Sequence, residues 1–213
     1  MSSRDLILGR VRAALTDVPA DDLPYERAVQ RGYRQEHGER TLAETVDLLA
    51  ENLADYRAIV HRTDEAGLPE LLARLLAEHG TRSVLVPRGL PPHWLAASAA
   101  EQIQDRAEDT PRELDRIASV VTGCAVAVAE TGTLVLDGGP DQGRRRITLV
   151  PDHHICVVRV PEQVVSSVPQ ALGRIDPTRP LTWISGPSAT SDIELDRVEG
   201  VHGPRRLEVI LAG

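Results

Sequence analysis

The stretch that decides the fold is Thr182–Leu211, with the sequence TWISGPSATSDIELDRVEGVHGPRRLEVIL. It begins and ends with apolar runs, 181–184 and 207–211, which we expect to be buried strands. The segment between them is polar and rich in small residues, and each of its two Gly-Pro pairs marks a turn. Loops of this kind, at the edge of a sheet, carry binding functions more often than they merely connect. The loop is therefore the first candidate for a ligand site.

This loop holds many of the polar groups that could act in catalysis or binding. Asp192 and Glu194 are candidates for proton transfer. For Glu194 a structural role is the alternative, because Ser191-x-x-Glu194 is also the capping box of a short helix. The other candidates would form one wall of a ligand site: Gly186, Pro187, Ser188 and Thr190.

Composition and charge narrow the classes of function. The chain has 213 residues and a formal net charge of −8 at pH 7. A nucleic-acid surface needs clustered cations, so no nucleic-acid partner is expected. No apolar run approaches the roughly 18 residues of a membrane span, and the N-terminus lacks the apolar core of a signal peptide. We expect a cytoplasmic protein with no membrane partner.

Lysine and cysteine usage restrict the cofactors. The chain contains no lysine, which excludes a P-loop lysine and Schiff-base or pyridoxal chemistry carried by this chain. Its two cysteines, Cys124 and Cys156, cannot by themselves supply the four thiolates of an iron–sulfur cluster. Both lie in apolar runs and are expected to be small buried side chains. We expect no cofactor in this chain.

The pattern of elements divides the chain near residue 55. Residues 1–55 read as a helical N-terminal extension and linker, with helices at 4–15 and 42–55 and a polar segment at 18–39 that is a linker or a mobile arm. In 56–213 strands and helices alternate, which predicts an α/β domain with a mostly parallel sheet flanked by helices. The expected strands are 56–61, 83–87, 124–129, 147–150 and 155–160. The expected helices are 68–79, 91–100, 114–120 and 161–172.

A second group of polar residues follows the apolar run 124–129. Thr131, Gly132 and Thr133 could form a tight turn whose amides and hydroxyls hold an anion, or a plain hairpin turn. Glu130 closes the run, either as a nucleophile or as a structural group that orders the turn or pairs with an arginine. The following arginines, Arg144, Arg145 and Arg146, should alternate across a strand. At least one would then face the loops as a clamp for a carboxylate or phosphate, the alternative being a solvated strand start.

The adjacent histidines His153 and His154 are candidates for proton transfer. In extended chain neighbouring side chains point to opposite sides, so the two are not expected to ligate one metal ion. We expect one of them to pack locally and the other to face the cleft. A metal site would need Asp192, Glu194 or His202 to complete it, and no metal is predicted because no HxH or HExxH spacing is present.

Three ordered blocks of sequence carry a resemblance to a known family. They are AETGTLVL (129–136), RITLVPDHHI (146–155) and SGPSATSDIE (185–194), and GVHGP (200–204) follows them. Together they resemble the lactate utilization protein C family (LutC/YkgG, LUD domain). The resemblance implies a NagB/RpiA/CoA-transferase-like α/β fold over 56–213. It also implies a role in a system that oxidises L-lactate to pyruvate, with the iron–sulfur cluster in partner subunits.

We therefore expect this chain to bind a small carboxylate or phosphate anion as a subunit of that system. Two alternatives stay open: a non-catalytic metabolite-binding or scaffold protein, and an acyl- or CoA-transferase-like enzyme that uses Glu130. The three blocks are expected to share one cleft, with Thr131, Arg145 or Arg146, and Ser188 in its lining. In open α/β sheets such a cleft lies beyond the carboxyl ends of the strands.

Overall fold

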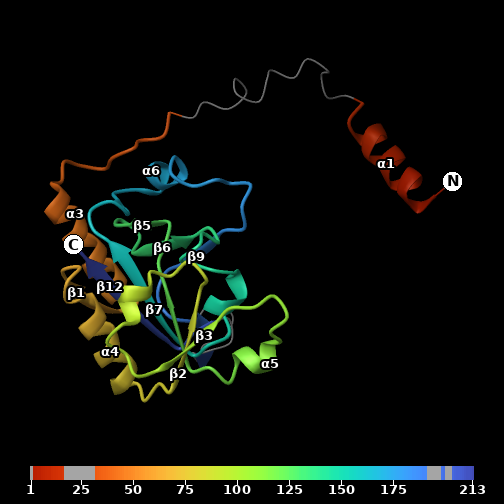
Figure 1. Ribbon diagram of the computed structural model, residues 1–213. Coiled ribbons are helices and arrows are strands. Elements are labelled where there is room, and N and C mark those ends of the chain that lie inside the picture. The colour runs from red at the N-terminus through yellow and green to blue at the C-terminus, as the bar shows by residue number, and fades with distance from the viewer. Residues whose placement is uncertain (1, 17–31, 191–197, 200–202) are drawn as a thin grey trace. The chain divides into compact units, whose positions relative to one another are not determined.

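A computed structural model describes residues 2–16, 32–190, 198–199 and 203–213 (Figure 1). The chain divides into two compact units, Met1–Arg34 and Gln35–Gly213. The described part of the first unit contains helix α1 (Ser3–Ala14), which begins with a capping box between Ser2 and Asp5 and has no buried residue. Within the described ranges, no helix has both the length and the apolar character needed to cross a membrane.

The second unit is built on a six-stranded sheet in which every pair of neighbouring strands is parallel. In sheet order the strands are β1 (Ile59–Thr63), β12 (Arg206–Ala212), β7 (His153–Arg159), β4 (Ser119–Thr122), β2 (Ser83–Val86) and β3 (Glu101–Gln104). The central strand β7 is buried from its first residue to Val158. This arrangement confirms the predicted α/β class with a parallel sheet flanked by helices.

Each face of this sheet packs against a different layer. Helix α4 (Leu68–Glu78) covers one face, where its leucines contact Ile155, Val157 and Ile210. Helix α3 (Leu42–Asp55) covers the other face, where a second cluster contains Cys156, Val158 and the odd-numbered residues of β12. Side chains of one strand alternate between faces, so consecutive residues of β7 enter different environments.

A smaller, four-stranded sheet shares the α3 side of the large sheet (Figure 1). Its strands, in sheet order, are β8 (Val164–Val165), β5 (Val126–Val128), β6 (Thr133–Leu136) and β9 (Thr182–Ile184). The expectation that 124–129 lies in the large parallel sheet is wrong. The run is apolar because both of its sides are buried, with Ala127 in the α3 cluster and Val126 and Val128 in a separate cluster under α6 (Val168–Leu172). A strand that is buried on both sides is a continuous apolar run, whether it lies in the large sheet or in the small one, so the sequence does not distinguish the two.

Four other expected elements differ from the structure, and one of them is the helix expected over 91–100, where only the 3₁₀ helix η1 (Pro92–Leu95) forms. Residues 147–150 are not a strand, since a 3₁₀ helix, η2 (Arg145–Thr148), precedes β7. The helix expected over 114–120 is the short α5 (Pro111–Leu114) followed by β4, and the helix expected over 161–172 is β8 followed by α6. These apolar runs are too short for their period to distinguish a helix from a strand. The remaining elements are a short antiparallel pair, β10 (Ala189–Thr190) and β11 (Val198–Glu199).

Candidate functional site

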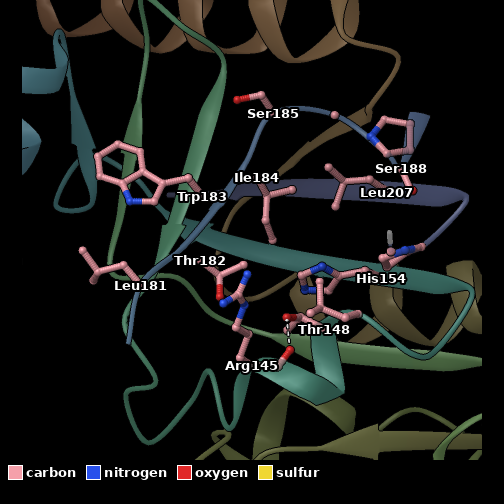
Figure 2. Close-up of a pocket in the computed structure, with 15 residues that line it drawn as sticks. Arg145, Thr148, His154, Leu181, Thr182, Trp183, Ile184, Ser185, Ser188 and Leu207 are labelled. Carbon is pink, nitrogen blue, oxygen red and sulfur yellow. Dashed lines mark hydrogen bonds between the residues drawn. The ribbon is translucent and has the colours of Figure 1, made fainter. Parts of the chain in front are cut away.

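A cavity of about 380 Å³ opens between η2, β9 and the first residues of β7 and β12 (Figure 2). We call it the His154 cavity. Its lining combines hydroxyl groups, one guanidinium and one imidazole with apolar side chains, as in many ligand sites. The lining residues are Arg145, Thr148, Leu149, His154, the segment 181–188, Gly203, Pro204 and Leu207.

The His154 cavity lies at the amino ends of the parallel strands. His154 and Leu207 are the second residues of β7 and β12 and pair in register. The expected position beyond the carboxyl ends is therefore wrong. The polar segments that line the cavity, η2 and Gly203-Pro204, precede the strands into which they lead.

His154 lines this cavity and has one nitrogen without a partner among the described residues. Its Nε2 and the Oγ1 of Thr122 form a hydrogen bond of 2.8 Å, while its Nδ1 is buried and has no hydrogen-bond partner among the described residues. Burial, with a smaller contribution from the charge of His153, lowers the pKa of His154 from 6.5 to about 3. The ring is thus neutral near pH 7, and the Thr122 hydroxyl, as donor or acceptor, decides which nitrogen carries the proton.

The three arginines have separate roles because they lie at a 3₁₀ helix and not on a strand. Arg144 forms an ion pair with Asp105, and Arg146 donates to the carbonyl oxygen of Ala107 at 2.7 Å. Arg145 is exposed, lines the cavity and has no side-chain hydrogen bond or ion pair within the described ranges. Successive residues of a 3₁₀ helix point about 120° apart, so one arginine of the three is directed to the cavity. Ile147, fully buried beside Leu85 and Val120, anchors this helix.

Strand β9 forms the opposite wall. Figure 2 shows Thr182 and Ile184 on the side of Arg145 and His154, with Leu181 and Trp183 on the other side of the strand. After β9 the chain turns at Gly186, whose φ is +82°. A Cβ atom there would lie 2.3 Å from the carbonyl oxygen of Tyr56, so only glycine fits. Pro187 and Ser188 continue the lining.

The Thr131–Thr133 turn reaches this wall only indirectly. It closes the β5–β6 hairpin, and the Oγ1 of Thr133 lies 2.8 Å from the Oγ atoms of both neighbours, Oγ1 of Thr131 and Oγ of Ser185. Ser185 lines the cavity, but Thr131 does not. Of the expected trio, Arg145 and Ser188 therefore share the cavity and Thr131 lies behind its wall. Gly132, with φ +53°, packs against the backbone of Asn52 in α3, 2.7 Å from the position of a Cβ atom.

Comparison with known proteins assigns this chain to a family. The sequence profile of the LUD domain matches residues 46–212. The chain belongs to the LUD domain family. It is 47% identical over 175 residues to lactate utilization protein C of Deinococcus radiodurans, a match that covers 80% of this chain and 81% of that protein. It is 30% identical to lactate utilization protein C of Bacillus licheniformis, over 96% of this chain and 90% of that protein.

A solved structure has the same fold as this LUD domain. It is the crystal structure of a DUF162 family protein from Deinococcus radiodurans, 40% identical, with a TM-score of 0.70. The match covers 82% of this chain and all of that chain. The family shown by these comparisons is the one that the three sequence blocks indicated.

Glu130 lies apart from the His154 cavity. One of its carboxylate oxygens is 2.9 Å from Nδ1 of His37, and the other accepts a hydrogen bond of 3.2 Å from Arg40. Its side chain is 20% exposed and is not in the lining of the cavity. Of the other expected residues, Asp192, Glu194 and His202 lie outside the described residues, and the side chain of Thr190 is not described.

His153 enters the α4 face of the LUD domain, where every polar atom of its ring has a partner. Its Nδ1 is 2.9 Å from Oγ of Ser119, and its Nε2 is 3.1 Å from Oε1 of Glu208. Glu208, fully buried, also bonds to His61 at 2.6 Å and accepts from Arg206 at 2.8 Å. Burial alone would raise the pKa of Glu208. The hydrogen bonds from His153, His61 and Arg206 outweigh it and hold that pKa well below its usual range.

The sequence reasoning missed several residues of the site and its surroundings. Glu208 had a usable signal, because a carboxylate inside the apolar run 207–211 needs buried partners. Thr122, Thr148 and Leu207 had none, since threonines and leucines are common in apolar runs of sequence. Among the described residues, no group of three His, Cys, Asp or Glu side chains could hold a metal ion. Cys124 and Cys156 are both buried, so this chain's thiols do not fit an iron–sulfur cluster.

Proposed function

We propose that this LUD-domain protein takes part in lactate utilization and binds a small 2-hydroxy or 2-oxo acid in the His154 cavity. The observation that carries the proposal is that two side chains line one cavity with donors or acceptors that have no partner among the described residues: the exposed guanidinium of Arg145 and the imidazole of His154, whose buried Nδ1 is unpaired. A guanidinium binds a carboxylate in a bidentate manner. A neutral imidazole nitrogen can pair with the hydroxyl or oxo group next to it. Relatives named lactate utilization protein C support the same choice, since L-lactate and pyruvate carry these groups.

The low pKa of His154 defines the role that we assign to it. A histidine with a pKa of about 3 is a weak base at pH 7. We assign it to orient the acid through Nδ1, with its ring fixed by Thr122. Arg145 neutralises the carboxylate, and the hydroxyl groups of Thr148 and Thr182 complete the polar lining. Asp192 and Glu194 remain candidates for proton transfer in the loop that follows Ser188.

We further propose that electron transfer takes place in iron–sulfur partner subunits. A chain with two buried thiols has too few ligands for a cluster of its own. The acyl- or CoA-transferase alternative gains no support from the geometry, because Glu130 is paired with His37 and Arg40 away from the His154 cavity. A metabolite-binding or scaffold role would use the same cavity and differs only in where the reaction occurs.

Calorimetric titration with L-lactate and pyruvate tests the proposal. Arg145→Gln removes a charged donor and is expected to weaken binding about 10- to 100-fold, because a hydrogen bond to a charged group contributes about 1.5–3 kcal/mol. Arg112→Gln is the matched control, since Arg112 is an exposed arginine of α5 outside the cavity lining. Absence of binding of both acids to the wild-type chain, or equal binding by both variants, would contradict the proposal.

A further inference from the structure

A second cavity adjoins the His154 cavity at Arg145. This second cavity also measures about 380 Å³ and shares three lining residues with the first: Arg145, Thr148 and Thr182. We call it the Arg179 cavity. Cavities above about 300 Å³ accommodate ligands of drug size, whereas L-lactate has only three carbon atoms. The two adjoining cavities therefore offer more space than the acid of the proposed function requires.

Positive charge exceeds negative charge in the lining of the Arg179 cavity. Arg144, Arg145 and Arg179 all line it, and among the described residues Asp137 is the one acidic residue of that lining. Asp137 accepts a hydrogen bond of 2.6 Å from Nη1 of Arg179, which leaves the other donors of that guanidinium available. Asp105, the partner of Arg144, is not part of this lining. An anion entering the cavity would meet a net positive field.

A preorganised glycine-rich loop forms the floor of the Arg179 cavity. Gly138 and Gly143 have φ values of +70° and +69°, a conformation that glycine adopts without strain. The loop is fixed from within, because Gly139 donates to Oδ1 of Asp137 and the side chain of Gln142 accepts from the backbone N–H of Asp137. A loop that is already ordered loses little entropy when it binds. Glycine turns beside arginines are a setting in which proteins bind phosphate.

We infer that the Arg179 cavity binds a phosphate group next to the carboxylate site. The inference rests on the proposed function, because the two cavities meet at Arg145. Arg179 is the main donor, Arg145 is shared with the acid, and Asp137 opposes the anion while it holds Arg179 in place. The phosphate comes from a phosphorylated metabolite or from the free ion, since both present the same oxygen atoms.

The charges of Arg179 and Asp137 make opposite predictions for phosphate affinity. In calorimetric titrations of the full chain with inorganic phosphate at constant ionic strength, Arg179→Gln is expected to weaken binding about tenfold or more. Asp137→Asn removes the negative charge, keeps an oxygen for the N–H of Gly139, and is expected to tighten binding several-fold. A purely structural role for the pair would move both variants in the same direction. Arg112→Gln should bind phosphate as the wild type does.

Titration of the same proteins with L-lactate separates this inference from the proposed function. Arg179→Gln is expected to keep its L-lactate affinity within about twofold, which also shows that the variant is folded. L-lactate should still bind when phosphate is saturating. The inference is overturned if wild type binds no phosphate, if the two variants shift in the same direction, or if phosphate and L-lactate exclude each other completely. Loss of L-lactate binding alone would overturn the proposed function instead. Glycerol 3-phosphate as a third titrant identifies the source, binding more tightly than phosphate if an ester is the ligand and less tightly if the free ion is.

Discussion

The two faces of β7 give adjacent histidines different hydrogen-bonding environments. On the α4 face, His153 is bonded at both nitrogens and lies with its ring centroid 4.1 Å from that of His79. On the other face, His154 is equally buried and lines a cavity, and among the described residues only its Nε2 has a partner, Thr122. A buried polar group without a partner is destabilising. We therefore expect His153 to contribute mainly to stability and, under the proposed function, His154 to contribute mainly to binding.

Removing the buried carboxylate of Glu208 on the α4 face should give the largest loss of stability. Glu208→Ala leaves His61, His153 and Arg206 without their shared carboxylate. Breaking a buried charged network from one side lowers the free energy of unfolding by about 3–5 kcal/mol. Urea denaturation measures the change. Glu101→Ala, at an exposed site in the edge strand β3, is the control and should stay within about 0.5 kcal/mol of wild type.

A matched pair of substitutions tests the comparison directly. His153→Leu leaves Ser119 and Glu208 each short of a partner and is expected to lower the free energy of unfolding by about 2–3 kcal/mol. His154→Leu removes the unpartnered nitrogen and should cost less than about 1 kcal/mol, the remaining loss being the hydrogen bond of Thr122. The same variant should bind L-lactate about tenfold more weakly. Equal losses of stability in the two variants would show that the faces do not differ as argued.

The low pKa of His154 predicts a specific dependence of stability on pH. The unfolded chain takes up a proton near pH 6.5, whereas the folded chain does so only near pH 3. Stability is therefore complete above pH 6.5 and declines as the pH falls toward 3. Between pH 7 and pH 5 the contribution of this group amounts to about 2 kcal/mol. Urea midpoints of wild type and His154→Leu at both pH values measure it, and the variant should lose correspondingly less stability than wild type.

Several features of these faces could be predicted from the sequence because they follow from local geometry. Alternation along a strand predicted that His153 and His154 point to opposite sides, and the structure confirms it. The recurring strands and helices predicted the parallel sheet. The meeting of Arg145 and Ser188 in one cavity was also expected, although the use of that cavity remains a prediction.

Other features depend on contacts between segments that are distant in sequence, so local sequence patterns could not predict them. Run 124–129 is apolar on both sides in the small sheet, as it would be in the large one. Arg145, and not its neighbours, lines the cavity because Ile147 anchors η2. Ile147 is buried beside Leu85 of β2 and Val120 of β4, which are distant in sequence. The position at the amino ends was available from chain order, since 144–152 and 203–205 precede their strands. The rule that ligand sites of open sheets lie beyond the carboxyl ends of the strands predicts the opposite edge.

The smallest expected effect concerns Glu130, outside both faces of β7. Its carboxylate pairs with His37 and Arg40, whose side chains are 50% and 32% exposed, so solvent screens both interactions. Glu130→Gln should therefore lower the free energy of unfolding by about 0.5–1 kcal/mol. Glu39→Gln is the control and should leave the free energy of unfolding unchanged. Glu39 lies in the same exposed segment as His37 and Arg40 and has no side-chain partner among the described residues. We expect no acyl-CoA exchange by wild type and hence none to lose in Glu130→Gln. Denaturant midpoints and an exchange assay on both proteins decide the matter, because exchange that is present in wild type and absent in the variant would make Glu130 a nucleophile.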